Sequence, residues 1–170
     1  MKPLAAIAPV AILCFGVGET GAASSDGGKT GRNCPLALAA YQAADQAILL
    51  EFRGDETRSF RVVVDGLDPM LDGYVFPDEA GEGELGVVLD DCPEGDVTGN
   101  DLSQCRIWQG PMLASGADGG TAPLPGHHQP ASPYVVMQGL DQALTQSALF
   151  VEAGLPAIEF EYLSLYACQE

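Results

Sequence analysis

The chain has 170 residues, with 24 aspartates and glutamates against seven lysines and arginines, and a formal net charge of −17 at pH 7. Nucleic acids and anionic lipids are bound through many Lys and Arg side chains, so this charge excludes both as partners. Intrinsic disorder combines high charge with low hydrophobicity, and a hydrophobic fraction of 46% argues against it.

Residues 1–22 are predicted to form a cleavable secretory signal peptide. Lys2 precedes an apolar run at 4–15, and small residues follow it. This order of a basic head, an apolar centre and a small-residue exit is what export requires. The run is shorter than the about 20 apolar residues that span a bilayer. We therefore expect cleavage near Ala22 or Ala23, a periplasmic or secreted product, and no stable membrane anchor.

The mature chain is predicted to consist of a flexible linker, 23–33, and a single globular, disulfide-bonded domain, 34–170. The linker is polar and rich in glycine, and the remaining length suffices for one domain with its own core. Lipidation at Cys14 is an alternative for the N-terminus. We disfavour it because Leu13 stands where a lipid-attachment site has a small residue.

The pattern along the domain predicts a mainly β fold. Alanine-rich residues 35–45 favour a helix with Pro35 in its first turn, although this segment runs directly into a strand-like one. Strand-like runs lie at 47–52, 59–65, 74–76, 85–89, 106–110 and 134–137. Short strands separated by glycine, proline and aspartate indicate an antiparallel sandwich or open barrel with one or two short helices. An α+β fold is the alternative.

Four cysteines follow the signal peptide, and an even number in an exported protein predicts two disulfides. Four cysteines allow three connectivities. We favour Cys92–Cys105, which closes a loop rich in glycine, aspartate and asparagine, and Cys34–Cys168, which ties the ends of the domain together. A zinc site fits poorly because the chain lacks a Cys-x-x-Cys pair and its histidines are distant in sequence.

The acidic loop 90–101 is a candidate calcium site, and Ca²⁺ is the one cofactor the sequence suggests. Calcium takes about six to eight oxygen ligands, which a disulfide-closed loop could hold together. The side chains that would supply them are Asp90, Asp91, Glu94, Asp96, Asn100 and Asp101. The spacing fails the EF-hand pattern, because Asp101 stands where that loop requires glycine. In a chain this acidic, a solvated turn is the alternative interpretation.

Residues 91–110, together with a cysteine near the C-terminus, resemble an uncharacterised group of small exported proteins of Gram-negative bacteria. The resemblance implies a location in the bacterial cell envelope and a structural role for the loop 92–105. It brings no known activity, so no functional residue follows from it.

The long segment 115–133 is rich in glycine and proline and carries both histidines, His127 and His128. Loops of this length are uncommon in compact domains and are usually functional or mobile. The histidines could bind a metal or act as a general base. Adjacent histidines rarely point the same way, however, and a catalytic base needs a fixed scaffold. We therefore expect an exposed loop.

Two elements are predicted after this loop. Residues 140–150 place leucines at helical spacing, and Gly154 fits the end of that helix. Residues 157–168 begin with strict alternation, which predicts a strand that starts at a sheet edge and ends buried. One face would carry Ile158, Phe160 and Tyr162, and the opposite face Glu159 and Glu161.

The sequence assigns no catalytic residue. Ser115 lacks the strand–turn–helix setting of a nucleophile elbow. Glu159 and Glu161 resemble the paired carboxylates of glycosidases, but such pairs normally come from different elements that flank a cleft. Aromatic side chains could line a ligand groove or a partner surface: Trp108, Tyr134, Tyr162 and Tyr166. For Trp108, close to a disulfide, we favour a core position.

We therefore expect an exported acidic module that binds a protein or a small ligand. Two alternatives come from other classes. One is a calcium-stabilised structural protein with its site at 90–101. The other is a hydrolase of envelope or environmental polymers that uses carboxylates or the two histidines.

Overall fold

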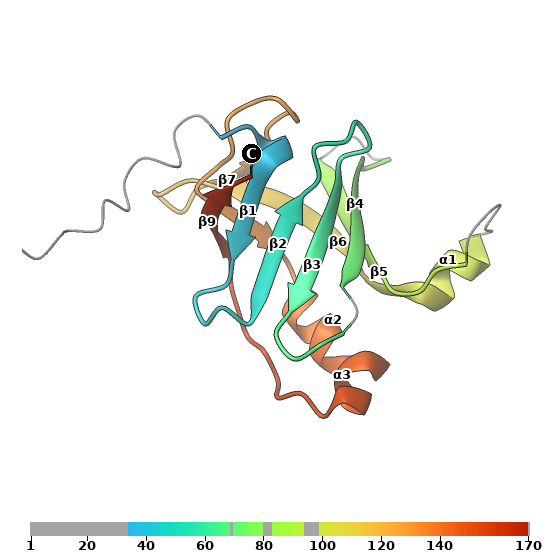
Figure 1. Cartoon of the computed structure of the whole chain (residues 1–170). Coiled ribbons are helices and arrows are strands. Elements are labelled where there is room, and N and C mark those ends of the chain that lie inside the picture. Colours follow the sequence, from blue (N-terminus) through green and yellow to red (C-terminus); the bar gives the residue numbers. More distant parts are fainter. Residues whose placement is uncertain (1–33, 69, 80–82, 94–98, 170) are drawn as a thin grey trace, which may run out of the picture.

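Eight antiparallel strands close on themselves into a barrel (Figure 1). The computed structural model describes residues 34–68, 70–79, 83–93 and 99–169, so the predicted signal peptide and linker lie outside the described residues. The strands are β1 (Ala39–Gln42), β2 (Ile48–Phe52), β3 (Ser59–Val64), β4 (Leu71–Pro77), β5 (Glu84–Leu89), β6 (Arg106–Ser115), β7 (Thr121–Pro123), β8 (Tyr134–Met137) and β9 (Leu163–Cys168). The helices are η1 (Leu36–Leu38), a 3₁₀ turn, and α1 (Gly99–Cys105), α2 (Leu140–Gln146) and α3 (Ala148–Ala153).

The strands follow an up-and-down order. Each strand from β1 to β6 pairs with the next one, β6 pairs with β8, β8 with β9, and β9 with β1. The short β7 pairs with the end of β6 and stands outside this ring. The prediction of a mainly β, antiparallel fold is confirmed, and its form is a barrel in which the last strand returns to the first.

Side chains fill the inside of the barrel. Residues alternate between a buried and a more exposed face along β2, β3 and β4, as a strand with one face on a core requires. A barrel of eight strands is just wide enough for side chains to fill. The largest fully buried ones include Tyr41, Phe52, Phe60, Leu71, Met112 and Leu163. The interior is therefore the hydrophobic core.

Glycines on the inner face make room for two aromatic rings. The ring of Phe60 lies over Gly73, where a Cβ atom would come within 2.1 Å of it. The indole of Trp108 lies over Gly86 and Gly110, where a Cβ would come within 2.8 and 2.9 Å. Trp108 is only 5% exposed, which confirms the predicted core position.

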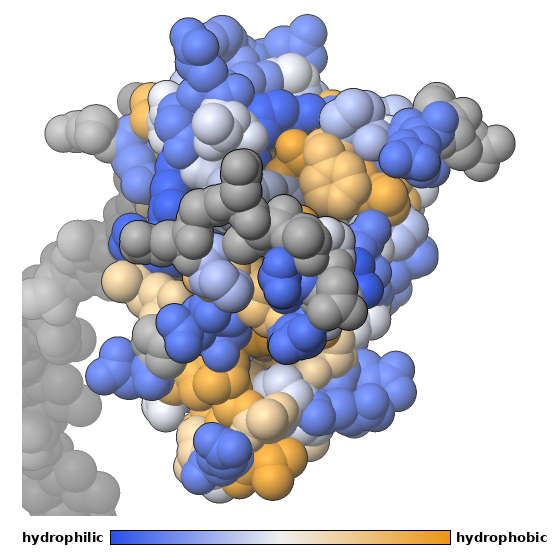
Figure 2. Space-filling view, turned by 90° about the vertical axis from the view of Figure 1, so that its right-hand side faces the viewer, coloured by the Kyte–Doolittle hydropathy of each residue, from blue (hydrophilic) through white to orange (hydrophobic). Residues whose placement is uncertain are grey.

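The helices α2 and α3 lie at the lower end of the barrel (Figure 1). Leu140, Leu144 and Phe150 are buried there as part of the core. Figure 2 shows apolar side chains gathered at the lower end of the face it presents. The apolar residues exposed on the molecule include Met70, at 53%, and Val151, at 71%.

The predicted helix at 140–150 is in fact two helices that meet at Ser147. Ser147 adopts an extended backbone, with ψ 152°, and its hydroxyl accepts a hydrogen bond from the Phe150 amide at 3.3 Å. Serine is a preferred residue at the start of a helix for this reason. Gly154 ends α3 in the left-handed conformation, with φ 65°, as its position predicted.

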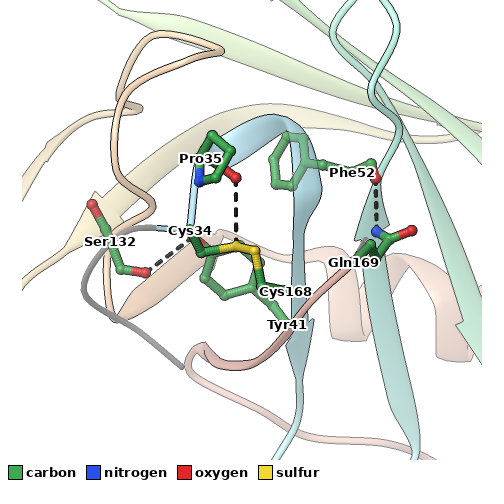
Figure 3. The surroundings of a disulfide bond; sticks show 7 residues. All are labelled: Cys34, Pro35, Tyr41, Phe52, Ser132, Cys168 and Gln169. Carbon is green, nitrogen blue, oxygen red and sulfur yellow. Dashed lines mark hydrogen bonds between the residues drawn. A yellow bond between two sulfur atoms is a disulfide. The ribbon is translucent and has the colours of Figure 1, made fainter. Parts of the chain in front are cut away.

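A disulfide and side-chain hydrogen bonds gather near the seam between β1 and β9 (Figure 3). Cys34 and Cys168 form a disulfide across it, with their Cα atoms 5.7 Å apart. The hydroxyl of Tyr41 donates to the Ser132 carbonyl at 3.0 Å, and burial raises the pKa of this tyrosine. The side-chain amide of Gln169 donates to the last carbonyl of β2 at 2.9 Å. Cys34 is thus joined to β9 and Gln169 to β2, so both ends of the described domain are fastened to the barrel.

The second predicted disulfide, Cys92–Cys105, is also present, with a Cα–Cα distance of 5.1 Å. The sequence predicts a loop between these cysteines. The structure instead has α1 over its last seven residues, Gly99–Cys105. Asp101 lies in the first turn of α1, where a carboxylate favours the positive end of the helix dipole.

The prediction of a helix at 35–45 is wrong. Only the 3₁₀ turn η1 forms, and the chain then enters β1, which pairs with β2 on one side and β9 on the other. Ala39, Ala40 and Tyr41 are all buried between these neighbours. Strand pairing and burial outweigh the helical preference of alanine, which amounts to only a few tenths of a kcal/mol per residue over most others.

The strand expected at 157–168 is shorter than its alternation indicates. It begins only at Leu163, because residues 157–162 do not pair with a neighbouring strand. The amide of Ile158 donates instead to the Thr145 hydroxyl of α2 at 3.2 Å. Ile158 is 9% exposed and anchors this segment to the helical end.

The long segment 115–133 is fastened to the barrel rather than free. The Leu36 amide donates to the Gln129 carbonyl at 2.9 Å, and the Ala131 amide to the Cys34 carbonyl at 2.7 Å. Leu124 and Ala131 are buried in the core. This loop therefore belongs to the same rigid unit as the seam.

We predict that the two disulfides contribute unequally to stability. They join residues 134 and 13 positions apart, and the loss of chain entropy in the unfolded state grows with this separation, giving about 5 and about 3 kcal/mol respectively. Cys34→Ser with Cys168→Ser should therefore lower the urea midpoint more than Cys92→Ser with Cys105→Ser. An equal or reversed order would show that this model does not apply here.

Gly73→Ala is expected to destabilise the barrel by about 3 kcal/mol, because the added methyl group would overlap the Phe60 ring. The matched control is Gly83→Ala, where a Cβ meets no atom within 4 Å and the change should stay within about 0.5 kcal/mol. Thermal unfolding of both variants measures the difference. Similar losses in the two variants would contradict the packing account.

Asp55 should make part of the stability depend on pH. Its carboxylate accepts hydrogen bonds from the Ser59 hydroxyl, from the Thr57 hydroxyl and from both backbone amides, and they lower its pKa from 3.8 to about 2. A lowered pKa in the folded state means that this stabilisation is present above pH 4 and is lost as the pH falls through 2.

We therefore expect Asp55→Asn to lower the melting temperature at pH 7, and this deficit to shrink between pH 4 and pH 2. Glu152→Gln on the exposed side of α3 is the control. A deficit that is constant with pH would instead indicate a loss of packing.

Candidate functional site

An opening in the barrel wall lies between β8 and the chain that leads into β9. The two strands share only two residue pairs, Tyr134 with Ser164 and Val135 with Leu163. β8 continues to Met137, whereas the other chain bends at Glu161. The two backbones therefore separate, and a groove of about 590 Å³ opens between them.

Three segments line this groove. One wall is the end of β8 and the turn into α2, from Tyr134 to Gly139. The opposite wall is the bend at 160–162, and the hairpin that joins β6 to β7 closes one end. Because α2 and the barrel hold both walls, the groove is part of the folded scaffold.

A pair of tyrosines marks the point where the strand pairing ends. The rings of Tyr134 and Tyr162 meet edge to face, with centroids 4.9 Å apart and an interplanar angle of 64°. They come from a diagonal position across the β8–β9 ladder, a separation that aromatic side chains can bridge. Tyr162 is 45% exposed, so part of its surface remains available to a ligand.

A second hollow, of about 610 Å³, lies next to the first one. It is bounded by the outer side of α2, including Asp141 and Thr145, and by residues 157–161. Phe160 and Glu161 line both hollows. We call the two together the acidic trough.

The acidic trough carries negative charge without a cationic side chain. Its carboxylates are those of Asp141, Glu159 and Glu161, and its described lining residues include no lysine, arginine or histidine. Arg53 and Arg58 form ion pairs elsewhere, with Asp72 and Glu84. The acidic trough would therefore attract a positively charged ligand and repel an anion.

Glu159 and Glu161 do not occupy one face of a strand, as their alternation predicts. The structure places them in the irregular wall of the acidic trough, where both are exposed. The sequence did identify Tyr134 and Tyr162 as candidate groove residues. No pattern in the sequence indicated that Asp141, Gln138 and the hairpin at 115–121 would line the acidic trough together with these tyrosines. Only the return of β9 to β8 brings these segments together.

The two histidines lie away from the acidic trough. His128 is exposed, as expected, whereas His127 is half-buried, so the expected exposure holds for only one of them. The rings of His127 and His128 nevertheless stack, with centroids 5.1 Å apart and an angle of 21°, so the expectation that they point apart is wrong. The Ala37 amide donates to the His127 carbonyl at 3.0 Å, which ties this part of the loop to η1.

The candidate calcium site is described only in part. Asp90 and Asp91 line a hollow of about 410 Å³ together with Asp72 of β4, which the sequence did not associate with them. Burial, and secondly the charge of Asp91, raise the pKa of Asp90. Asp72 is also paired with Arg53 at 2.5 Å, which competes with a metal ion for its carboxylate.

The other residues of the candidate calcium site, so far as the structure describes them, do not extend this acidic cluster. Glu94 and Asp96 lie outside the described residues, as does the side chain of Asn100, and Asp101 lies in α1. Across the described part of the chain, no three or more His, Cys, Asp or Glu side chains are grouped so that they could hold a metal ion. Calcium binding therefore stays a prediction.

No protein-family model, curated protein or solved structure matches this chain. The resemblance to exported Gram-negative proteins accordingly stays a prediction too. The two disulfides are compatible with a location outside the cytoplasm. Within the described ranges, no helix has the length and apolar character needed to cross a membrane.

Proposed function

We propose that this protein is an exported binding module that holds a positively charged ligand in the acidic trough. The observation that carries the proposal is a pair of hollows that share Phe160 and Glu161. Together they present a tyrosine pair, of which Tyr162 is exposed, and three carboxylates, with no lining cation among the described residues.

The barrel itself supports a site on the wall. Its interior is occupied by buried aromatic and aliphatic side chains, which leaves the ligand an outer surface. The ring faces of tyrosines attract cations, by about 0.5–2 kcal/mol depending on how much water is excluded. Nearby carboxylates add steering over a distance of about 8–10 Å at physiological salt. A cationic ligand therefore gains from both features at once.

A hydrolase is less well supported by the same residues. A carboxylate acts as a general acid near neutral pH when its surroundings shelter it from water. Glu159 and Glu161 are exposed, and the histidines lie outside the acidic trough. Binding requires no such shelter, because charge and aromatic surface suffice.

The proposed location is the periplasm or the cell exterior. It is supported by the signal-peptide pattern of residues 1–22 and by two disulfides, which persist in oxidising compartments. The charge of −17 suits such a compartment, since mutual repulsion keeps exported domains apart in solution.

Binding of a flexible lysine tetrapeptide, capped at both ends, tests the proposed function by calorimetry at low salt. We expect Tyr162→Ala and Glu161→Gln each to weaken binding about fivefold to tenfold, because each removes one attraction of about 1 kcal/mol. The matched controls are Tyr166→Ala, an exposed tyrosine on β9, and Glu152→Gln.

The control variants should bind as the unmodified protein does, and affinity should fall as salt is raised. Equal losses in the controls would mean that the net charge of the whole surface, rather than the acidic trough, attracts the peptide. Absence of binding to the unmodified protein would refute the proposal.

A further inference from the structure

We infer that the ligand of the acidic trough is an extended, basic segment of a polypeptide that pairs with the open edge of β8. The inference rests on the proposed function of the acidic trough and specifies its ligand class. Two observations support it: the direction of the backbone groups at the end of β8, and the negative charge of the wall opposite them.

The register between β8 and β9 shows which backbone groups face the opening. The Leu165 amide donates to the Pro133 carbonyl at 2.8 Å, so the polar groups of residue 133 point towards β9. Backbone groups two residues apart on a strand point the same way. Those of Val135 therefore face Leu163, its partner in the ladder, and those of Met137 face the next position along the same edge.

That next position is where the wall opens. Continuing the register by two residues would place Glu161 opposite Met137, yet the chain bends at Glu161 and the ladder stops at Val135. Met137 and Glu161 line the groove instead of pairing across it. The edge of β8 is therefore presented to the groove, and an exposed strand edge is a template for pairing with another chain.

The buried side chain of Met137 fixes this edge in place. Met137 is 3% exposed and belongs to the core. On the side of β8 that faces away from the groove, Met137 pairs with Met112 of β6. The indole N–H of Trp108 donates to the carbonyl of Gln138 at 3.0 Å. An incoming strand would thus meet a backbone that is already ordered, which lowers the entropic cost of binding.

The carboxylates supply the charge that a basic segment needs. Glu159 and Glu161 are exposed in the irregular wall of the acidic trough, with the half-buried Phe160 between them in sequence. A segment with several basic side chains would bring its positive charges close to these glutamates.

The length of the acidic trough also favours a polypeptide over a small cation. The hollow beside β8 and the hollow beside α2 measure about 590 and 610 Å³, and Asp141 extends the negative charge into the second one. A chain several residues long could occupy both hollows, whereas one ammonium group would occupy a fraction of either.

The test compares two capped hexapeptides of alternating arginine and valine, which differ only in N-methylation of alternate backbone amides. The peptides carry the same charge, but the methylated one cannot donate the hydrogen bonds of a β-ladder. We expect the unmethylated peptide to bind at least tenfold more tightly. We also expect it to slow hydrogen exchange of the Met137 amide on the full exported chain, with the amide of Tyr166 as an unaffected control.

The outcomes separate this inference from the proposed function. Equal affinity of the two peptides, with unchanged exchange at Met137, would overturn strand pairing and leave cation binding intact. Failure of both peptides and of the lysine tetrapeptide would overturn both proposals. Self-association of the chain through β8 that the peptide does not displace would assign the edge to a second copy and would also overturn the inference.

Discussion

The structure depends on the pairing of β9 with β1, which turns a sheet into a barrel. These strands lie at opposite ends of the domain, and their contact brings together residues more than 120 positions apart. Chain entropy opposes such a contact more strongly than it opposes a hairpin. The Cys34–Cys168 disulfide, the Tyr41–Ser132 hydrogen bond and the Gln169 amide all act at this seam, where the entropic cost is greatest.

Closure also decides where a ligand can bind. With eight strands, the lumen holds little more than its own side chains, and here two aromatic rings lie over glycines of the same strand or of the neighbouring strand. The acidic trough exists because closure is incomplete along one edge: β9 meets β8 over two residue pairs and then diverges. The same strand thus completes the core at one end and opens the wall at the other.

The distribution of charge gives this opening its character. The ion pairs of Arg53 and Arg58 join the β2–β3 hairpin region to β4 and β5, on a different part of the wall from the acidic trough. The chain has few cations, and the described residues that line the acidic trough include no lysine, arginine or histidine beside its carboxylates. Electrostatic attraction of this kind raises the rate and selectivity of association more than its affinity. The exposed ring of Tyr162 and the strand edge are therefore the features that would hold a ligand in place.

The sequence by itself determined the features that depend on local pattern and residue chemistry. The antiparallel strands at 48–52, 59–64 and 84–89, the helix end at Gly154 and both disulfides follow from alternation, turn residues and cysteine count. The tertiary structure alone decided three others. Alanine-rich residues 39–42 became a strand because neighbours bury them on both sides, and the alternating residues 157–162 stayed irregular because α2 holds Ile158. The acidic trough joins Asp141, Glu161 and Tyr134 across three segments, and a pattern read along one chain carries no information about contacts that only barrel closure creates.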